Sequence, residues 1–109
     1  MTPKLSLLTQ QLVEKIFEPG DQAEASRRLI EQCGANLPFC KGHDEFKMER
    51  IRFAALRISR GNLNDLQEAI DLAKIDWRDV LVWARFADRL DAHQKWAEQT
   101  LKGNAEPLR

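Results

Sequence analysis

Apolar residues along the chain recur mainly at spacings of three and four positions, the period of a helix that buries one face. Near the N-terminus this stripe consists of Leu5, Leu8, Leu12 and Ile16. No segment shows the alternating pattern of a half-buried strand, and Pro, Gly, Asn and Asp separate the apolar stripes. The pattern predicts an all-α protein, a compact bundle of five to six helices.

Residues that favour helix ends divide this pattern into elements. The expected helix starts are Thr2 with Pro3, Asp21, Asp44, Asn62 or Asn64, and Asp76. The expected ends are Pro19 with Gly20, Gly34 in a left-handed turn, Gly61 and Lys74. A loop is predicted over residues 35–43, and Asp91 either begins a sixth helix or lies within a longer fifth one. Residues 1–102 are predicted to form a single domain and residues 103–109 a frayed tail.

The segment from Ile75 to Leu90 has an unusual density of apolar residues, with seven among the eight positions 80 to 87. Asp76 is expected to cap a helix, and Ile75 is expected to pack on Val80 across the cap. Positions 80, 81, 84, 87 and 90 share one face, while positions 82, 83 and 86 fall on its flanks and back. A helix that is apolar nearly all round is either a core helix or an interface helix.

Tryptophan is common in protein interfaces as well as in cores, since it buries a large area with little loss of rotamer freedom. The predicted contact residues are Trp77, Val82, Trp83, Phe86 and Trp96. A chain of 109 residues has difficulty covering all of them, and a large exposed apolar patch usually binds something. The sequence therefore favours a non-enzymatic protein-interaction module, either a homodimer or bound to another protein.

Charge and cysteine content narrow the possible partners. Seventeen basic residues balance seventeen acidic ones, so the net field does not attract nucleic acid or an anionic membrane from a distance. The N-terminal leucines are interrupted by Thr9, Gln10 and Gln11, and no apolar run reaches the length of a membrane span. Two cysteines are too few for a disulfide framework. A cytoplasmic protein is expected.

A DNA-binding helix-turn-helix over residues 64–86 is the first alternative. The candidate phosphate contacts are Arg78, Arg50 and Arg57. However, Asp76 and Asp79 lie on the expected reading face, where phosphate contact favours several basic residues. The basic row of residues 47, 50 and 57, or the acidic row that follows it within residues 62–79, is a further candidate surface for a partner of opposite charge.

A metal site formed by Cys33, Cys40 and His43 is the second alternative, because thiolate and imidazole are good zinc ligands. Structural zinc sites normally contain a tighter cysteine pair, and here six residues separate the two thiols. No spacing indicates a base held beside Cys40 for nucleophilic catalysis. No cofactor is therefore expected, and no enzymatic activity.

Two stretches within residues 60–82 carry a resemblance to known proteins. The stretch from Arg60 to Gln67 reads RGNLNDLQ, and the stretch from Lys74 to Val82 reads KIDWRDVLV. This segment resembles a block found in small uncharacterised bacterial proteins of about this size, which have no assigned function. The resemblance implies a bacterial cytosolic protein with an all-helical fold, and it supplies no active-site residue.

Overall fold

The computed structural model describes residues 5–34 and 45–103, and these residues form six α-helices and no strand. The helices are α1 (Leu7–Ile16), α2 (Pro19–Gln32), α3 (Glu45–Ser59), α4 (Leu63–Ile75), α5 (Trp77–Ala84) and α6 (Ala92–Leu101). The prediction of an all-α bundle is confirmed, and α6 is a separate helix that begins after Asp91. The predicted start of the first helix at Thr2 and Pro3 is wrong, because α1 begins at Leu7 after its cap Ser6. The predictions for Asp44 and the loop 35–43 lie outside the described residues.

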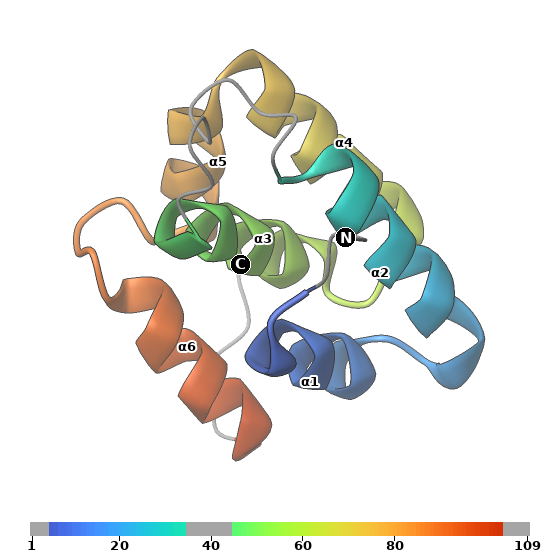
Figure 1. The fold of residues 1–109 in the computed structure, drawn as a ribbon. Helices are drawn as coiled ribbons and strands as arrows, with labels where there is room; N and C mark the ends of the chain where they lie inside the picture. The colour runs from blue at the N-terminus through green and yellow to red at the C-terminus, as the bar shows by residue number, and fades with distance from the viewer. Residues whose placement is uncertain (1–4, 35–44, 104–109) are drawn as a thin grey trace.

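Helix α3 lies at the centre of the molecule, and it contacts α1, α4, α5 and α6 (Figure 1). From Ile51 to Ser59 every residue except Arg57 is buried. Ala54 and Ala55 allow this close packing, because small side chains let neighbouring helices approach. The radius of gyration of 12.5 Å is close to the roughly 13 Å of a compact domain of this length.

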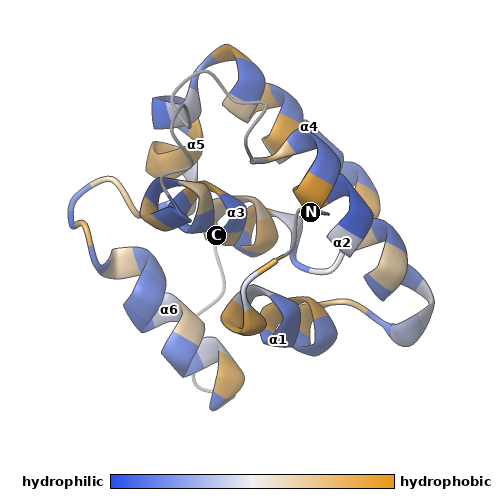
Figure 2. Cartoon of the chain, in the orientation of Figure 1, coloured by the Kyte–Doolittle hydropathy of each residue, from blue (hydrophilic) through white to orange (hydrophobic). Residues whose placement is uncertain are grey.

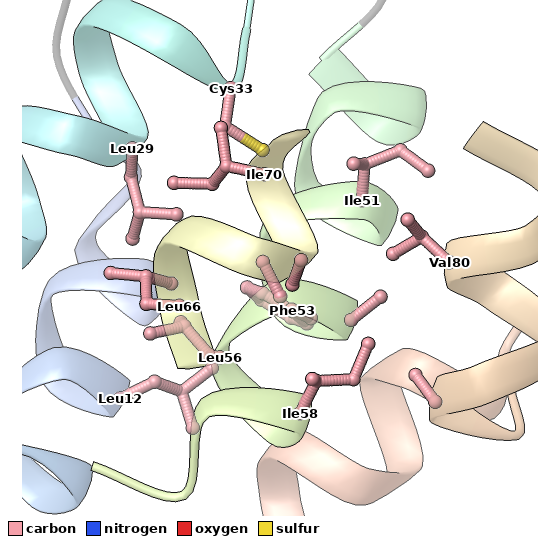
Figure 3. Close-up of a cluster of buried hydrophobic side chains, with 14 of the residues drawn as sticks. Leu12, Leu29, Cys33, Ile51, Phe53, Leu56, Ile58, Leu66, Ile70 and Val80 are labelled. Carbon is pink, nitrogen blue, oxygen red and sulfur yellow. The ribbon is translucent and has the colours of Figure 1, made fainter. Parts of the chain in front are cut away.

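Phe53 of α3 is fully buried in the hydrophobic core. Figure 3 shows it among leucine, isoleucine and valine side chains from several helices, including Leu66 of α4 and Val80 of α5. Burying one such large side chain stabilises the folded state by about 1.5–3 kcal/mol. The core therefore joins α3 to its neighbours in one continuous cluster.

The boundary between α1 and α2 differs from the prediction. Ser6 caps α1 by accepting a hydrogen bond from the backbone N–H of Thr9 at 3.1 Å. Pro19 is the first residue of α2 rather than the end of α1, because proline needs no hydrogen-bond partner in a first helical turn. Asp21 therefore lies inside the first turn of α2, and Glu18 occupies the cap position.

Glu24 of α2 forms ion pairs with two arginines of the same helix. Its carboxylate accepts hydrogen bonds from Arg27 and from Arg28, the latter at 2.6 Å. The Arg27 hydrogen bond, followed by that from Arg28, lowers the pKa of Glu24 to about 2. The carboxylate thus supports the exposed side of α2 rather than its N-terminus.

Two glycines follow helices and have different roles. Gly34 does not have the left-handed backbone that was predicted; a Cβ there would lie 2.5 Å from Nη2 of Arg52, so a larger residue would require the end of the Arg52 side chain to shift. Gly61 does end α3 with φ of 84°, a conformation that favours glycine. A Cβ at Gly61 would also lie 2.6 Å from the carbonyl oxygen of Ile16, so this turn packs tightly against α1.

The predicted caps of α4 and α5 are confirmed. Asn62 accepts a hydrogen bond from the N–H of Asp65, and Asp76 accepts one from the N–H of Arg78. The predicted staple is wrong, since Ile75 is 84% exposed whereas Val80 is buried.

Orange hydrophobic and blue hydrophilic segments alternate along α4 and α5 in Figure 2. In the part of the chain that the structure describes, every helix is too short or too polar to cross a membrane.

Candidate functional site

Helix α5 is short, and local chemistry defines both of its ends. Asp76 caps its N-terminus through a 3.0 Å hydrogen bond to the N–H of Arg78. At the C-terminus Arg85 adopts a left-handed conformation with φ of 64°. The backbone N–H of Phe86 then donates to the carbonyl of Leu81 at 2.8 Å. The chain therefore turns after Ala84, and the predicted continuation of the helical face to residues 87 and 90 is wrong.

The inner and outer faces of α5 differ in exposure. Val80, Leu81 and Ala84 are buried against the core. Val82 is 63% exposed and Trp83 is 45% exposed, and α5 lies at the periphery of the molecule (Figure 1). The prediction that these two side chains lie off the core is confirmed.

Phe86 and Trp96 are not part of the exposed surface. Phe86 is 0% exposed and Trp96 is 6% exposed, and their ring centroids are 5.7 Å apart. The left-handed turn at Arg85 directs Phe86 back toward α3 instead of along the outer side of α5. The prediction that Phe86 lies partly off the core is therefore wrong, and both residues belong to the core of the single chain.

Trp77 occupies an intermediate position at the start of α5. It is partly buried and packs against the core. The guanidinium carbon of Arg78 lies 5.8 Å from the centroid of the Trp77 ring, and Nε of Arg78 lies 3.9 Å from a carboxylate oxygen of Asp76. Trp77 therefore borders the outer face of α5 rather than forming its centre.

Two of the three candidate phosphate contacts lie beside Phe86. Nη2 of Arg50 donates a hydrogen bond to the carbonyl of Phe86 at 2.7 Å. The guanidinium carbon of Arg57 lies 5.3 Å from the centroid of the Phe86 ring, a distance typical of a cation–π contact. Both arginines therefore support the segment that follows α5. The structure does not bring them together with Arg78 on the outer face of α5.

The helix pair formed by α4 and α5 also lacks the predicted turn. Helix α4 continues to Ile75, and Asp76 alone separates it from α5, so the turn does not begin at Lys74. Asp76 both ends α4 and caps α5. A helix-turn-helix usually has a turn of three or four residues. The geometry of this pair therefore gives no support to DNA recognition.

Of the three candidate metal ligands, the structure describes only Cys33. Cys33 is buried at the end of α2, and the carbonyl oxygen of Cys33 accepts a hydrogen bond from Nε of Arg52 at 2.8 Å. Cys40 and His43 lie outside the described residues. Within residues 5–34 and 45–103, no three or more His, Cys, Asp or Glu side chains are grouped in a way that could hold a metal ion.

His93 is the buried centre of an aromatic cluster that the sequence pattern did not single out. It is buried, and its ring centroid lies 5.1 Å from that of Phe46 and 5.5 Å from that of Phe53. Burial, followed by the positive charge of Arg50, lowers the pKa of His93 to about 4. The available signal was the helical spacing of His93, Trp96 and Ala97, which form the buried face of α6.

Comparisons of the chain with protein-family models, with curated proteins and with solved structures found no match. The resemblance to small bacterial proteins therefore stays a prediction.

Proposed function

We propose that this protein is a non-enzymatic interaction module that binds another protein through the outer face of α5. One observation carries the proposal. Among the described residues six large hydrophobic side chains are exposed, and Val82 and Trp83 are the two that lie on α5, next to each other in sequence; Ile75 ends α4 directly before this helix and Leu90 follows it. Exposed apolar side chains scattered singly are normal, whereas neighbouring ones are typical of an interaction surface.

The position of Trp83 supports a protein partner. A tryptophan that is half exposed beside an exposed valine offers a large apolar contact at small entropic cost. The neighbouring polar residues Arg78 and Asp79 are exposed, which corresponds to the polar rim that usually surrounds such a contact. The resemblance to bacterial proteins supports a cytoplasmic location as part of the same proposal.

Site-specific photo-crosslinking in the producing cells tests the proposal. A photoreactive amino acid at position 82 is expected to give a discrete protein adduct, because the partner would cover this residue. The matched control carries the same amino acid at Gln11, an exposed position on α1, and is expected to give no such adduct. The substitution Trp83→Asp should abolish the adduct from position 82 while the circular dichroism of the purified protein stays helical.

Two outcomes would contradict the proposal. Equal adducts from positions 82 and 11 would show that crosslinking only reports exposure. Loss of helical structure in the Trp83→Asp variant would place Trp83 in the core of the single chain, and the surface would then not exist.

A further inference from the structure

Two opposite charges flank the exposed apolar residue Val82, one on α5 and one in the turn that ends this helix. Asp79 lies three residues before Val82, Arg85 lies three residues after it, and all three are exposed. In the described part of the chain neither Asp79 nor Arg85 forms an ion pair within the protein, whereas the nearby Arg78 is joined to Asp76 at 3.9 Å. Two unpaired charges of opposite sign thus flank Val82 symmetrically in sequence.

We propose that α5 pairs with α5 of a second copy of this chain in an antiparallel arrangement, with Val82 near the two-fold axis and Asp79 opposite Arg85 of the other copy. This inference rests on the proposed function, and it names the partner. In a two-fold interface the same patch meets itself, so residues at equal distances on opposite sides of the axis face each other. Asp79 lies one turn before Val82, about 4.5 Å along α5, whereas Arg85 follows the end of the helix in the left-handed turn.

The two-fold arrangement forms the ion pair between Asp79 and Arg85 twice, once at each end of the interface. Asp79 of one copy faces Arg85 of the other, and the reverse holds at the opposite end of the interface. Packed helices are about 8–10 Å apart, a gap that an aspartate and an arginine side chain together can span. Val82 and Trp83, the exposed apolar residues, would supply the buried centre of the contact.

The charges favour a second copy over a partner of one sign. The face contains a carboxylate and a guanidinium, so a purely acidic or purely basic partner would meet repulsion at one end. The formal net charge of the chain is zero, and two copies therefore approach without net repulsion. Nucleic acid, which presents only negative charge, fits this face poorly because of Asp79.

The expected dimer is small and dissociable. Helix α5 has eight residues, which corresponds to about 12 Å of helix. A standard stable interface buries about 800 Å² on each partner, and one short helix with its flanking residues lies at or below this area. We therefore expect dimer to convert to monomer on dilution.

Charge reversal tests the pairing. Wild-type molar mass is measured by light scattering over about a hundredfold range of concentration, together with Asp79→Arg, Arg85→Asp and the double variant. Each single reversal places like charges opposite each other at both ends, so we expect each to raise the dimer Kd at least about tenfold. The double variant restores opposite charges at both ends and is expected to dimerise like the wild type.

Mixing the two single variants gives a sharper result. The Asp79→Arg chain has two basic residues at the paired positions and the Arg85→Asp chain has two acidic ones, so a heterodimer has both ion pairs. Native mass spectrometry should therefore detect the heterodimer in preference to either homodimer. Glu98→Arg, at an exposed position of α6, is the control that should dimerise normally, and circular dichroism checks that each variant is folded.

Three results would overturn the inference. A wild-type protein that is monomeric at every concentration excludes self-pairing. If position 82 of this monomer still crosslinks to a different protein, the proposed function stands without the self-pairing. If position 82 gives no crosslink, both the self-pairing and the proposed function are excluded. A dimer that tolerates both single reversals excludes the antiparallel pairing. Single variants that do not form the heterodimer exclude it as well.

Discussion

At the scale of single residues, His93 couples protonation to folding. It is buried between Phe46 and Phe53, and the groups that act on its charge are Arg50, which lowers its pKa, and Leu90 and Asp91, which raise it. Burial is the largest effect, and the resulting pKa of about 4 lies below the ordinary value near 6.5. The folded protein therefore keeps His93 neutral at pH values where the unfolded chain protonates it.

Stability should consequently fall as the pH falls from about 6.5 toward about 4, because the unfolded state binds more protons in this window. Between pH 8 and pH 5 the contribution of His93 amounts to roughly 2 kcal/mol of unfolding free energy. Urea denaturation at a series of pH values measures it, with His43→Gln as the background because the chain has two histidines. In that background His93→Phe should remove most of the slope between pH 7 and pH 5. An unchanged slope would assign the pH dependence to other groups.

At the scale of elements, Asp76 serves two helices. Its backbone N–H donates to the carbonyl of Leu72 at 2.7 Å at the end of α4, and its carboxylate accepts from the N–H of Arg78 at the start of α5. Asp76→Ala is expected to reduce the unfolding free energy by about 0.5–2 kcal/mol, the usual effect of losing an N-cap. Asp91→Ala is the matched control, since the side chain of Asp91 makes no capping hydrogen bond to α6. Equal losses in the two variants by urea denaturation would show that capping is not the cause.

The same elements show what the sequence could predict. The caps at Asn62 and Asp76 could be predicted because the side chain and the N–H that it binds are only two or three residues apart. The end of α5 could not be predicted, since Arg85 is not a residue that favours the left-handed conformation. Contacts of Phe86 with Arg50, Arg57 and Trp96 accompany this turn, and all of those residues are distant in sequence or in other elements.

The sequence could assign some residues of the candidate site to the protein surface, but not others. Val82 and Trp83 could be assigned to the outer side of α5 because helical periodicity alone places them opposite or beside the buried positions 80, 81 and 84. Phe86 and Trp96 could not be assigned, since their burial depends on how the segment after α5 folds onto α3 and α6. Periodicity predicts a face within one helix, and it does not predict which tertiary contacts follow the end of that helix.

At the scale of the whole molecule, the central position of α3 predicts that the helices unfold together. Phe53 is fully buried in the cluster that α3 shares with its neighbours. Phe53→Ala should therefore reduce the free energy of unfolding by about 3–5 kcal/mol. This is a large part of the total unfolding free energy of a small domain, which is about 5–15 kcal/mol. Phe46→Ala is the matched control on the same helix, because Phe46 is exposed at the N-terminal end of α3 and loses mainly its contact with His93.

Circular dichroism reports all helices, whereas tryptophan fluorescence reports α5 and α6. If α3 joins the molecule into one cooperative unit, Phe53→Ala lowers the urea midpoint of both signals by the same amount. Separate midpoints for the two signals would instead show that α5 and α6 unfold independently of the helices on the other side of α3.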